Sequence, residues 1–334
     1  MRRFLIRLTR FLLIPIIGLA VLYFIADPYK TLKPFSLEDF DSTNRDYLSS
    51  ELFLMNYPEK KYDSFIFGSS RGCGINTYHW AKYLPEGSSQ FLFQSWSETL
   101  TGIEQKISYI FDHGYPIKNA IILIDIPGTF SKDQLPKRAL AIKDPNISGQ
   151  SHWIYQSILM YDFMQKPSQW LKAVRQMIHP SLPTINFDPV SNDWNKHNSS
   201  IDLSIPPPKD SLSNLSKRAK ADFLNELKVK EGRINVSDPL IDENMKMQLK
   251  HIREIFDTCG TDFRIVITPG YCYSYPAVSR QDLELLKSCF GEERVFNYTG
   301  KNPLTSDYNN YSDPNHFGLF VGWHIIEDIY NTIN

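Results

Sequence analysis

The segment FIFGSSRG places two adjacent hydroxyl groups at the end of an apolar run, because Ser69 and Ser70 directly follow residues 65–68. A serine hydroxyl becomes an effective nucleophile when a neighbouring base removes its proton. The segment SDPNHFG, near the other end of the chain, carries such a base in His316, and Asp313 three residues earlier can orient its imidazole ring. Together the two segments predict nucleophilic catalysis by Ser70. The alternative is a serine that only caps the next helix.

The elements that must position these residues alternate between strands and helices. Short apolar runs predict strands at 62–68, 89–94, 119–128, 262–270 and 294–300, and helical spacing of apolar residues predicts helices at 99–114, 242–260, 279–291 and 316–334. Strands that are separated by helices are typical of a parallel sheet. The sequence therefore predicts an α/β fold, a three-layer α/β/α sandwich around a parallel sheet.

Polar residues follow the predicted strands, at the edge where open parallel sheets bind ligands. Here Ser70 is the predicted nucleophile, His316 its base and Asp313 the residue that orients the base. Other residues at this edge are predicted to bind an oxyanion or substrate, namely Ser69, Arg71, Ser95, Ser97 and Asp125. For Arg71 an ion pair within the protein is the alternative, and for Asp125 a structural carboxylate in a turn.

These motifs resemble the SGNH, or GDSL-type, serine hydrolases over roughly residues 60–334. In that superfamily a G-D-S turn follows the first strand and an Asp-x-x-His motif precedes the last helix. Ser70 matches the nucleophile, Ser69 stands at the Asp position, and Asp313 and His316 match the second motif. The resemblance implies a flavodoxin-like SGNH fold and an esterase or O-acyltransferase activity.

The resemblance is closer to membrane-anchored bacterial members that have a G-S-S turn. These include relatives of the D-alanyl transfer protein of teichoic acid assembly and of the alginate acetylation proteins. For this chain the resemblance implies an acyl-ester or glycan substrate, with cell-surface polysaccharide as the acceptor. It also implies a membrane and a multi-pass membrane acyltransferase as partners.

The chain departs from the superfamily pattern at the two other blocks that supply oxyanion donors. FQSWSETL lacks the glycine of the second block, and ILIDIPGTF lacks the asparagine of the third. Loss of one such donor costs about 2.7–4 kcal/mol of transition-state stabilisation. The alternative function is therefore a non-catalytic accessory or scaffold protein for modification or export of surface polysaccharide.

The N-terminus is basic and apolar. Four arginines and no acidic residue occur in the first ten residues, and residues 11–26 carry no charge. A helix that spans a bilayer needs about 20 apolar residues, and basic residues favour the cytoplasmic side. We expect a single-pass transmembrane anchor within 1–27, a connector at 28–61, and a main domain at 62–334 that is periplasmic or extracellular. A cleaved signal peptide is the alternative.

Residues 129–240 interrupt the alternation of strands and helices. This stretch contains many prolines and polar turns, with helical patterns at 151–165 and 213–228. It is predicted to be an insertion that forms a lid or cap over the edge of the sheet. A set of loops without a function is the alternative.

Charge and cysteine content exclude other classes of protein. The net charge of −1 gives no electrostatic reason to expect a nucleic-acid partner. The four cysteines form no C-x-x-C motif and the histidines lack metal spacing, so no metal and no cofactor are predicted. Cys259 and Cys289 end successive helices at one edge of the sheet, which predicts a disulfide between them, with free thiols as the alternative.

Overall fold

The computed structural model describes residues 1–37, 44–131, 142–179, 187–194, 205–207, 209, 225 and 234–331. The chain divides into two compact units. The first contains Met1–Glu51 and Leu135–Ile185, and the second contains Leu52–Gln134 and Asn186–Asn334. Part of the predicted 129–240 insertion thus belongs with the N-terminal segment. Of the predicted helix at 213–228, residue 225 alone lies among the described residues, and it is helical.

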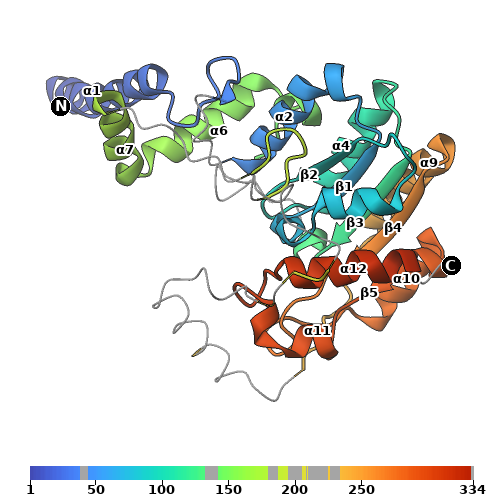
Figure 1. Ribbon diagram of the computed structural model, residues 1–334. Coiled ribbons are helices and arrows are strands. Elements are labelled where there is room, and N and C mark those ends of the chain that lie inside the picture. The colour runs from blue at the N-terminus through green and yellow to red at the C-terminus, as the bar shows by residue number, and fades with distance from the viewer. Residues whose placement is uncertain are drawn as a thin grey trace. The chain divides into compact units, whose positions relative to one another are not determined.

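The second unit contains a five-stranded parallel sheet with the strand order β2-β1-β3-β4-β5 (Figure 1). All residues of β1 and β3 are buried, as expected for strands that are covered on both faces. The predicted α/β class with a parallel sheet is confirmed. The strands are β1 (Ser64–Gly68), β2 (Gln90–Gln94), β3 (Asn119–Ile124), β4 (Asp262–Ile267) and β5 (Val295–Asn297).

Helices cover both faces of this sheet. On one face, Ile66 and Ile121 pack in a cluster with Ile325 of α12. On the other face, the ring of Phe53 in α2 (Arg45–Lys60) contacts Phe93 of β2 at 5.1 Å between centroids. The other helices of this unit are α3 (Thr77–Trp80), α4 (Leu100–Asp112), α9 (Glu243–Cys259), α10 (Arg280–Phe290), α11 (Pro303–Ser306) and α12 (Leu319–Asn331). Short 3₁₀ turns are η2 (Ser70–Gly74), η3 (Ala81–Tyr83), η4 (Gly128–Phe130), η7 (Glu292–Arg294) and η8 (Tyr308–Asn310).

Side-chain caps fix where three of the predicted helices begin. The side chains of Thr99, Asp242 and Ser279 accept hydrogen bonds from backbone N–H groups in the first turns of α4, α9 and α10. Such caps satisfy donors that have no partner within the helix. Gly260 ends α9 with φ 64°, a left-handed conformation that glycine adopts without strain.

The last helix begins later than the sequence indicates. The predicted helix at 316–334 starts at Leu319, so His316 lies in the loop that precedes it. In this loop Tyr311 and Phe317 form an isolated antiparallel bridge. The imidazole is therefore held by a short hairpin-like loop.

The first unit is helical. It contains α1 (Arg2–Ala26), α5 (Pro145–Ser148), α6 (His152–Met164), α7 (Pro167–Ile178) and the start of α2. Tyr23 of α1 packs with Tyr155, Leu159 and Phe163 of α6 and with Ala173 of α7. The helix predicted at 151–165 corresponds to α6, whereas α7 was not predicted.

The predicted transmembrane anchor falls on α1. In the part of the chain that the structure describes, none of the helices has both the length and the apolar character needed to span a bilayer.

The cysteines do not form the predicted disulfide. None of Cys73, Cys259, Cys272 and Cys289 is part of a disulfide. A disulfide needs Cα atoms about 4.4–6.8 Å apart and Cβ atoms that face each other. Two helix ends at one edge of a sheet do not guarantee this geometry. Burial raises the pKa of the Cys259 thiol and that of the Cys289 thiol.

A close backbone contact joins α12 to η2. A Cβ atom placed on Gly322 would lie 1.8 Å from the carbonyl oxygen of Gly74. Glycine is therefore required at position 322, where the helix meets the turn that begins with Ser70. This contact places the first turn of α12 against the end of η2.

Gly322→Ala is expected to destabilise the protein by about 1–3 kcal/mol or more, because a backbone carbonyl cannot move aside as a side chain can. The higher helix propensity of alanine, about 1 kcal/mol, is too small to offset this clash. Urea unfolding measures the change. The control is Gly128→Ala, where the nearest atom would be the Asp125 Cβ at 3.6 Å, and it should stay within about 0.5 kcal/mol of wild type. Equal stability of all three proteins would contradict the close packing.

Candidate active site

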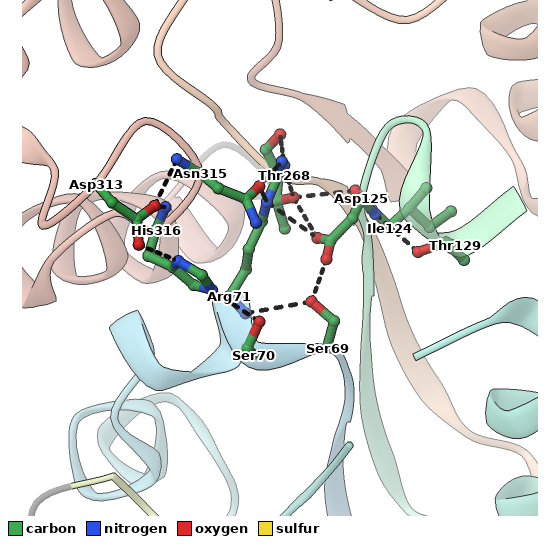
Figure 2. Close-up of polar contacts among 10 residues, drawn as sticks. All are labelled: Ser69, Ser70, Arg71, Ile124, Asp125, Thr129, Thr268, Asp313, Asn315 and His316. Carbon is green, nitrogen blue, oxygen red and sulfur yellow. Dashed lines mark hydrogen bonds and ion pairs between the residues drawn. The ribbon is translucent and has the colours of Figure 1, made fainter. Parts of the chain in front are cut away.

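Ser70, His316 and Asp313 form a chain of hydrogen bonds at the carboxyl end of β1. The Ser70 Oγ lies 2.8 Å from the His316 Nε2, and the His316 Nδ1 lies 2.7 Å from the Asp313 Oδ2 (Figure 2). An ionised carboxylate only accepts hydrogen bonds, so Nδ1 carries the ring proton and Nε2 of the neutral ring can accept from the serine. The His316 side chain is 33% exposed, which leaves this chain of hydrogen bonds accessible from solvent.

The loop itself orients Asp313. The Asp313 Oδ1 accepts hydrogen bonds from the backbone N–H of Asn315 at 2.8 Å and of His316 at 3.0 Å. Burial opposes ionisation of the Asp313 carboxyl. The hydrogen bond and charge of His316 and these backbone donors outweigh it, so the pKa of Asp313 is lowered from its ordinary value. Asp313 therefore remains ionised and can stabilise a charged imidazole.

Arg71 connects the two loops that carry the catalytic candidates. Its guanidinium donates from Nε to the Asn315 Oδ1 at 2.8 Å, and Nη2 also donates to this oxygen. Nη1 donates to the Thr268 Oγ1 at 2.9 Å, and the guanidinium lies over the ring of Tyr275. Because Arg71 follows Ser70 and Asn315 precedes His316, one buried cation holds the nucleophile and the base in register.

Asp125 provides the negative charge beside this buried cation. The Asp125 Oδ1 lies 3.7 Å from the Arg71 Nε and accepts a hydrogen bond from the Thr268 Oγ1 at 2.6 Å. Its Oδ2 accepts from the Ser69 Oγ (Figure 2). A buried carboxylate requires such partners, because an unpaired buried charge is strongly destabilising. Asp125 thus fixes the residue directly before Ser70.

The five residues predicted to bind an oxyanion or substrate fall into two groups. Ser69, Arg71 and Asp125 belong to the buried network behind Ser70. Ser95 and Ser97 follow β2, but within the described residues neither hydroxyl forms a hydrogen bond with Ser70 or His316. The buried Ser95 hydroxyl donates to the Trp96 carbonyl at 3.4 Å, and Ser97 is exposed.

Sequence reasoning missed two residues of the network, Thr268 and Asn315. Thr268 directly follows β4, so the rule that ligands bind beyond strand ends applies to it as well. Asn315 lies inside the Asp-x-x-His motif. These two positions in the sequence indicate residues near the site. Nothing in the sequence indicates that Arg71 binds both of them.

The chemistry of the site is proton transfer next to a hydroxyl group. In the described ranges, no group of three or more His, Cys, Asp or Glu side chains could hold a metal ion. His316 can take a proton from Ser70, and Asp313 can stabilise the resulting charge. The arrangement suits nucleophilic attack by Ser70 on an electrophilic carbonyl.

No protein-family model matches the chain, and no curated protein matches it either. The resemblance to SGNH hydrolases therefore stays a prediction that rests on the two motifs.

Replacement of Asp313 by Asn should make the protein less stable in a pH-dependent way. A lowered pKa in the folded state stabilises the protein above the ordinary Asp pKa of about 3.9, and this contribution is lost as pH falls through the folded value. The gap in unfolding free energy between wild type and Asp313→Asn should thus be full at neutral pH and shrink in acid. Urea unfolding at a series of pH values measures it. A gap that widens in acid would refute the assignment.

Proposed function

We propose that this protein is an SGNH-like serine esterase or O-acyltransferase that acts on acyl esters. The 2.8 Å contact between the Ser70 Oγ and the His316 Nε2, with Asp313 on the other side of the ring, carries the proposal. Residues 246 positions apart meet there in the order that a nucleophile, a base and an orienting carboxylate require. The finer SGNH assignment of the α/β fold is part of this proposal.

In the first step, Ser70 attacks the carbonyl carbon of the ester. As the bond from Oγ to carbon forms, the hydroxyl proton passes to the His316 Nε2 and the carbonyl becomes a tetrahedral oxyanion. Asp313 accepts the Nδ1 hydrogen bond and stabilises the imidazolium. The intermediate collapses, the ester bond breaks, and the departing alcohol takes the proton from His316. The product of this step is an acylated Ser70.

In the second step, His316 acts as a base for the acceptor. A water molecule or an acceptor hydroxyl attacks the acyl carbon while its proton passes to the Nε2. The bond to the Ser70 Oγ then breaks, and the imidazolium returns its proton to that oxygen. With water the reaction is hydrolysis, and with a hydroxyl it is acyl transfer. The partly exposed ring supports access by either acceptor.

Cell-surface polysaccharide as the glycan and a multi-pass membrane acyltransferase as the partner are proposed from the resemblance alone. The proposed location is outward-facing, with a single-pass anchor at the N-terminus. This location rests on the arginine-rich start of the chain and the uncharged run that follows it.

The second candidate function is a non-catalytic accessory protein. It is favoured by the position after β3, where Asp125 stands in place of the superfamily's asparagine and a carboxylate cannot donate to an oxyanion. The side chains of Ser69 and Arg71 are engaged in the same network. Retention of full cellular function by Ser70→Ala, together with co-purification of a membrane complex, would support this candidate over the enzyme.

Ser70→Ala should abolish covalent labelling by a fluorophosphonate probe, because the probe reacts with a serine that is activated by a base. The control is Ser288→Ala, an exposed serine on α10, which keeps the Ser70–His316 pair and its supports and should still be labelled. Gel fluorescence after a short incubation is the measurement. Labelling of Ser70→Ala at the wild-type level would exclude Ser70 as the labelled nucleophile.

His316→Gln should lower kcat for a p-nitrophenyl ester by about 10²–10⁴-fold, the usual contribution of a general base. KM should change little, because His316 acts in the transition state more than in substrate binding. Steady-state kinetics on the purified protein test this. His251→Gln, on the exposed side of α9, is the control and should match wild type. An equal loss in both variants would remove His316 from the mechanism.

A further inference from the structure

Helix α7 carries a second apolar face in addition to the one that it buries. Ala173 packs into the core of the first unit. Leu171, Val174 and Ile178 recur at helical spacing on another side and are exposed, Leu171 to 74%. Exposed apolar side chains that gather on one face of a helix indicate a candidate interaction site.

Helix α6 shows the same division between a buried and an exposed face. Tyr155, Leu159 and Phe163 are buried against α1. Trp153 and Tyr161 are exposed, to 84% and 65%. Tryptophan and tyrosine are the side chains most enriched where a bilayer meets water, because each joins an apolar ring to a polar group.

The exposed apolar residues of α1 lie within the same unit. Tyr23 of α1 donates a hydrogen bond to the Gln156 Oε1 of α6 at 2.8 Å, and its ring contacts that of Phe163. Helices α1, α6 and α7 therefore pack together (Figure 1). On α1 the side chains of Phe11, Ile14 and Ile17 remain exposed.

The charge of these helices identifies what would cover them. Residues 151–179 contain three basic side chains, Lys166, Lys172 and Arg175, and one acidic side chain, Asp162. Asp162 is paired with Lys166 and accepts a hydrogen bond from Tyr29. Lys172 and Arg175 are exposed on α7. A surface that is both apolar and basic is complementary to anionic lipid headgroups.

We propose that the exposed faces of α6 and α7, which pack against α1, bind the surface of a lipid bilayer that contains anionic lipids. The apolar side chains insert at the level of the headgroups, and Lys172 and Arg175 contact lipid phosphates. This part of the predicted 129–240 insertion then serves as a membrane contact and not as a lid. The proposal does not depend on the chemistry at Ser70.

The sharpest test follows Trp153 of the full-length protein. Vesicles of phosphatidylcholine and phosphatidylglycerol with brominated acyl chains quench tryptophan fluorescence on direct contact. The tryptophan fluorescence of wild type should be quenched by these vesicles. Trp153→Phe should lose the part of this quenching that comes from Trp153, and its circular dichroism spectrum should match that of wild type. Quenching that is identical in wild type and Trp153→Phe would show that Trp153 does not meet lipid and would overturn the proposal.

A second measurement tests the charge argument with variants that should fold normally. Lys172→Gln/Arg175→Gln should bind the anionic vesicles roughly 5- to 30-fold more weakly than wild type, since each basic residue near such a surface adds about fivefold to the affinity. The control is Met247→Gln, an exposed apolar position on α9, which should bind as wild type does. Equal binding of wild type to anionic and to neutral vesicles would also overturn the proposal. Crosslinking of Trp153 variants to a protein instead of lipid would overturn it as well and would assign the surface to that protein.

Discussion

The guanidinium of Arg71 is the interaction on which the candidate site depends. It is buried, and it binds Thr268 after β4 and Asn315 before α12 while it lies beside Asp125 after β3. Strands β1, β3 and β4 are neighbours in the sheet, so one cation joins the ends of three adjacent strands to the loop of His316. Removal of one partner from a buried charge pair typically costs about 3–5 kcal/mol, because the other charge is left uncompensated. The position of the Ser70 hydroxyl relative to the imidazole is therefore tied to the stability of the fold.

Close backbone packing also fixes the position of Ser70 relative to His316. Gly322 allows α12 to touch the carbonyl of Gly74, and Gly68 lies so close to Leu123 that a Cβ atom there would be 2.7 Å from the Leu123 Cβ. These contacts leave the turn after β1 little room to move. A nucleophile and a base that come from opposite ends of the chain keep a hydrogen-bonding distance only if both supports are rigid.

The strands and the helices that flank them could be predicted, because buried parallel strands are almost continuously apolar and amphipathic helices repeat every three or four residues. Ser70 and His316 could be placed at one edge because strand ends converge there. The partners of Arg71 could not be predicted, since Thr268 and Asn315 carry no pattern that singles them out. Helix α7 was missed because its exposed apolar face does not follow the usual rule that apolar residues face a core. The predicted disulfide failed because sequence order gives no Cβ directions.

Asp125 shows how the support of the site limits its chemistry. An asparagine at this position could donate to an oxyanion, but it would leave Arg71 without its buried carboxylate partner. Loss of one donor costs about 2.7–4 kcal/mol of transition-state stabilisation, which is comparable to the cost of breaking the pair. The chain therefore keeps a well-ordered Ser70–His316–Asp313 geometry at the expense of a side-chain donor. A carboxylate at position 125 cannot donate a hydrogen bond to the oxyanion of the proposed reaction.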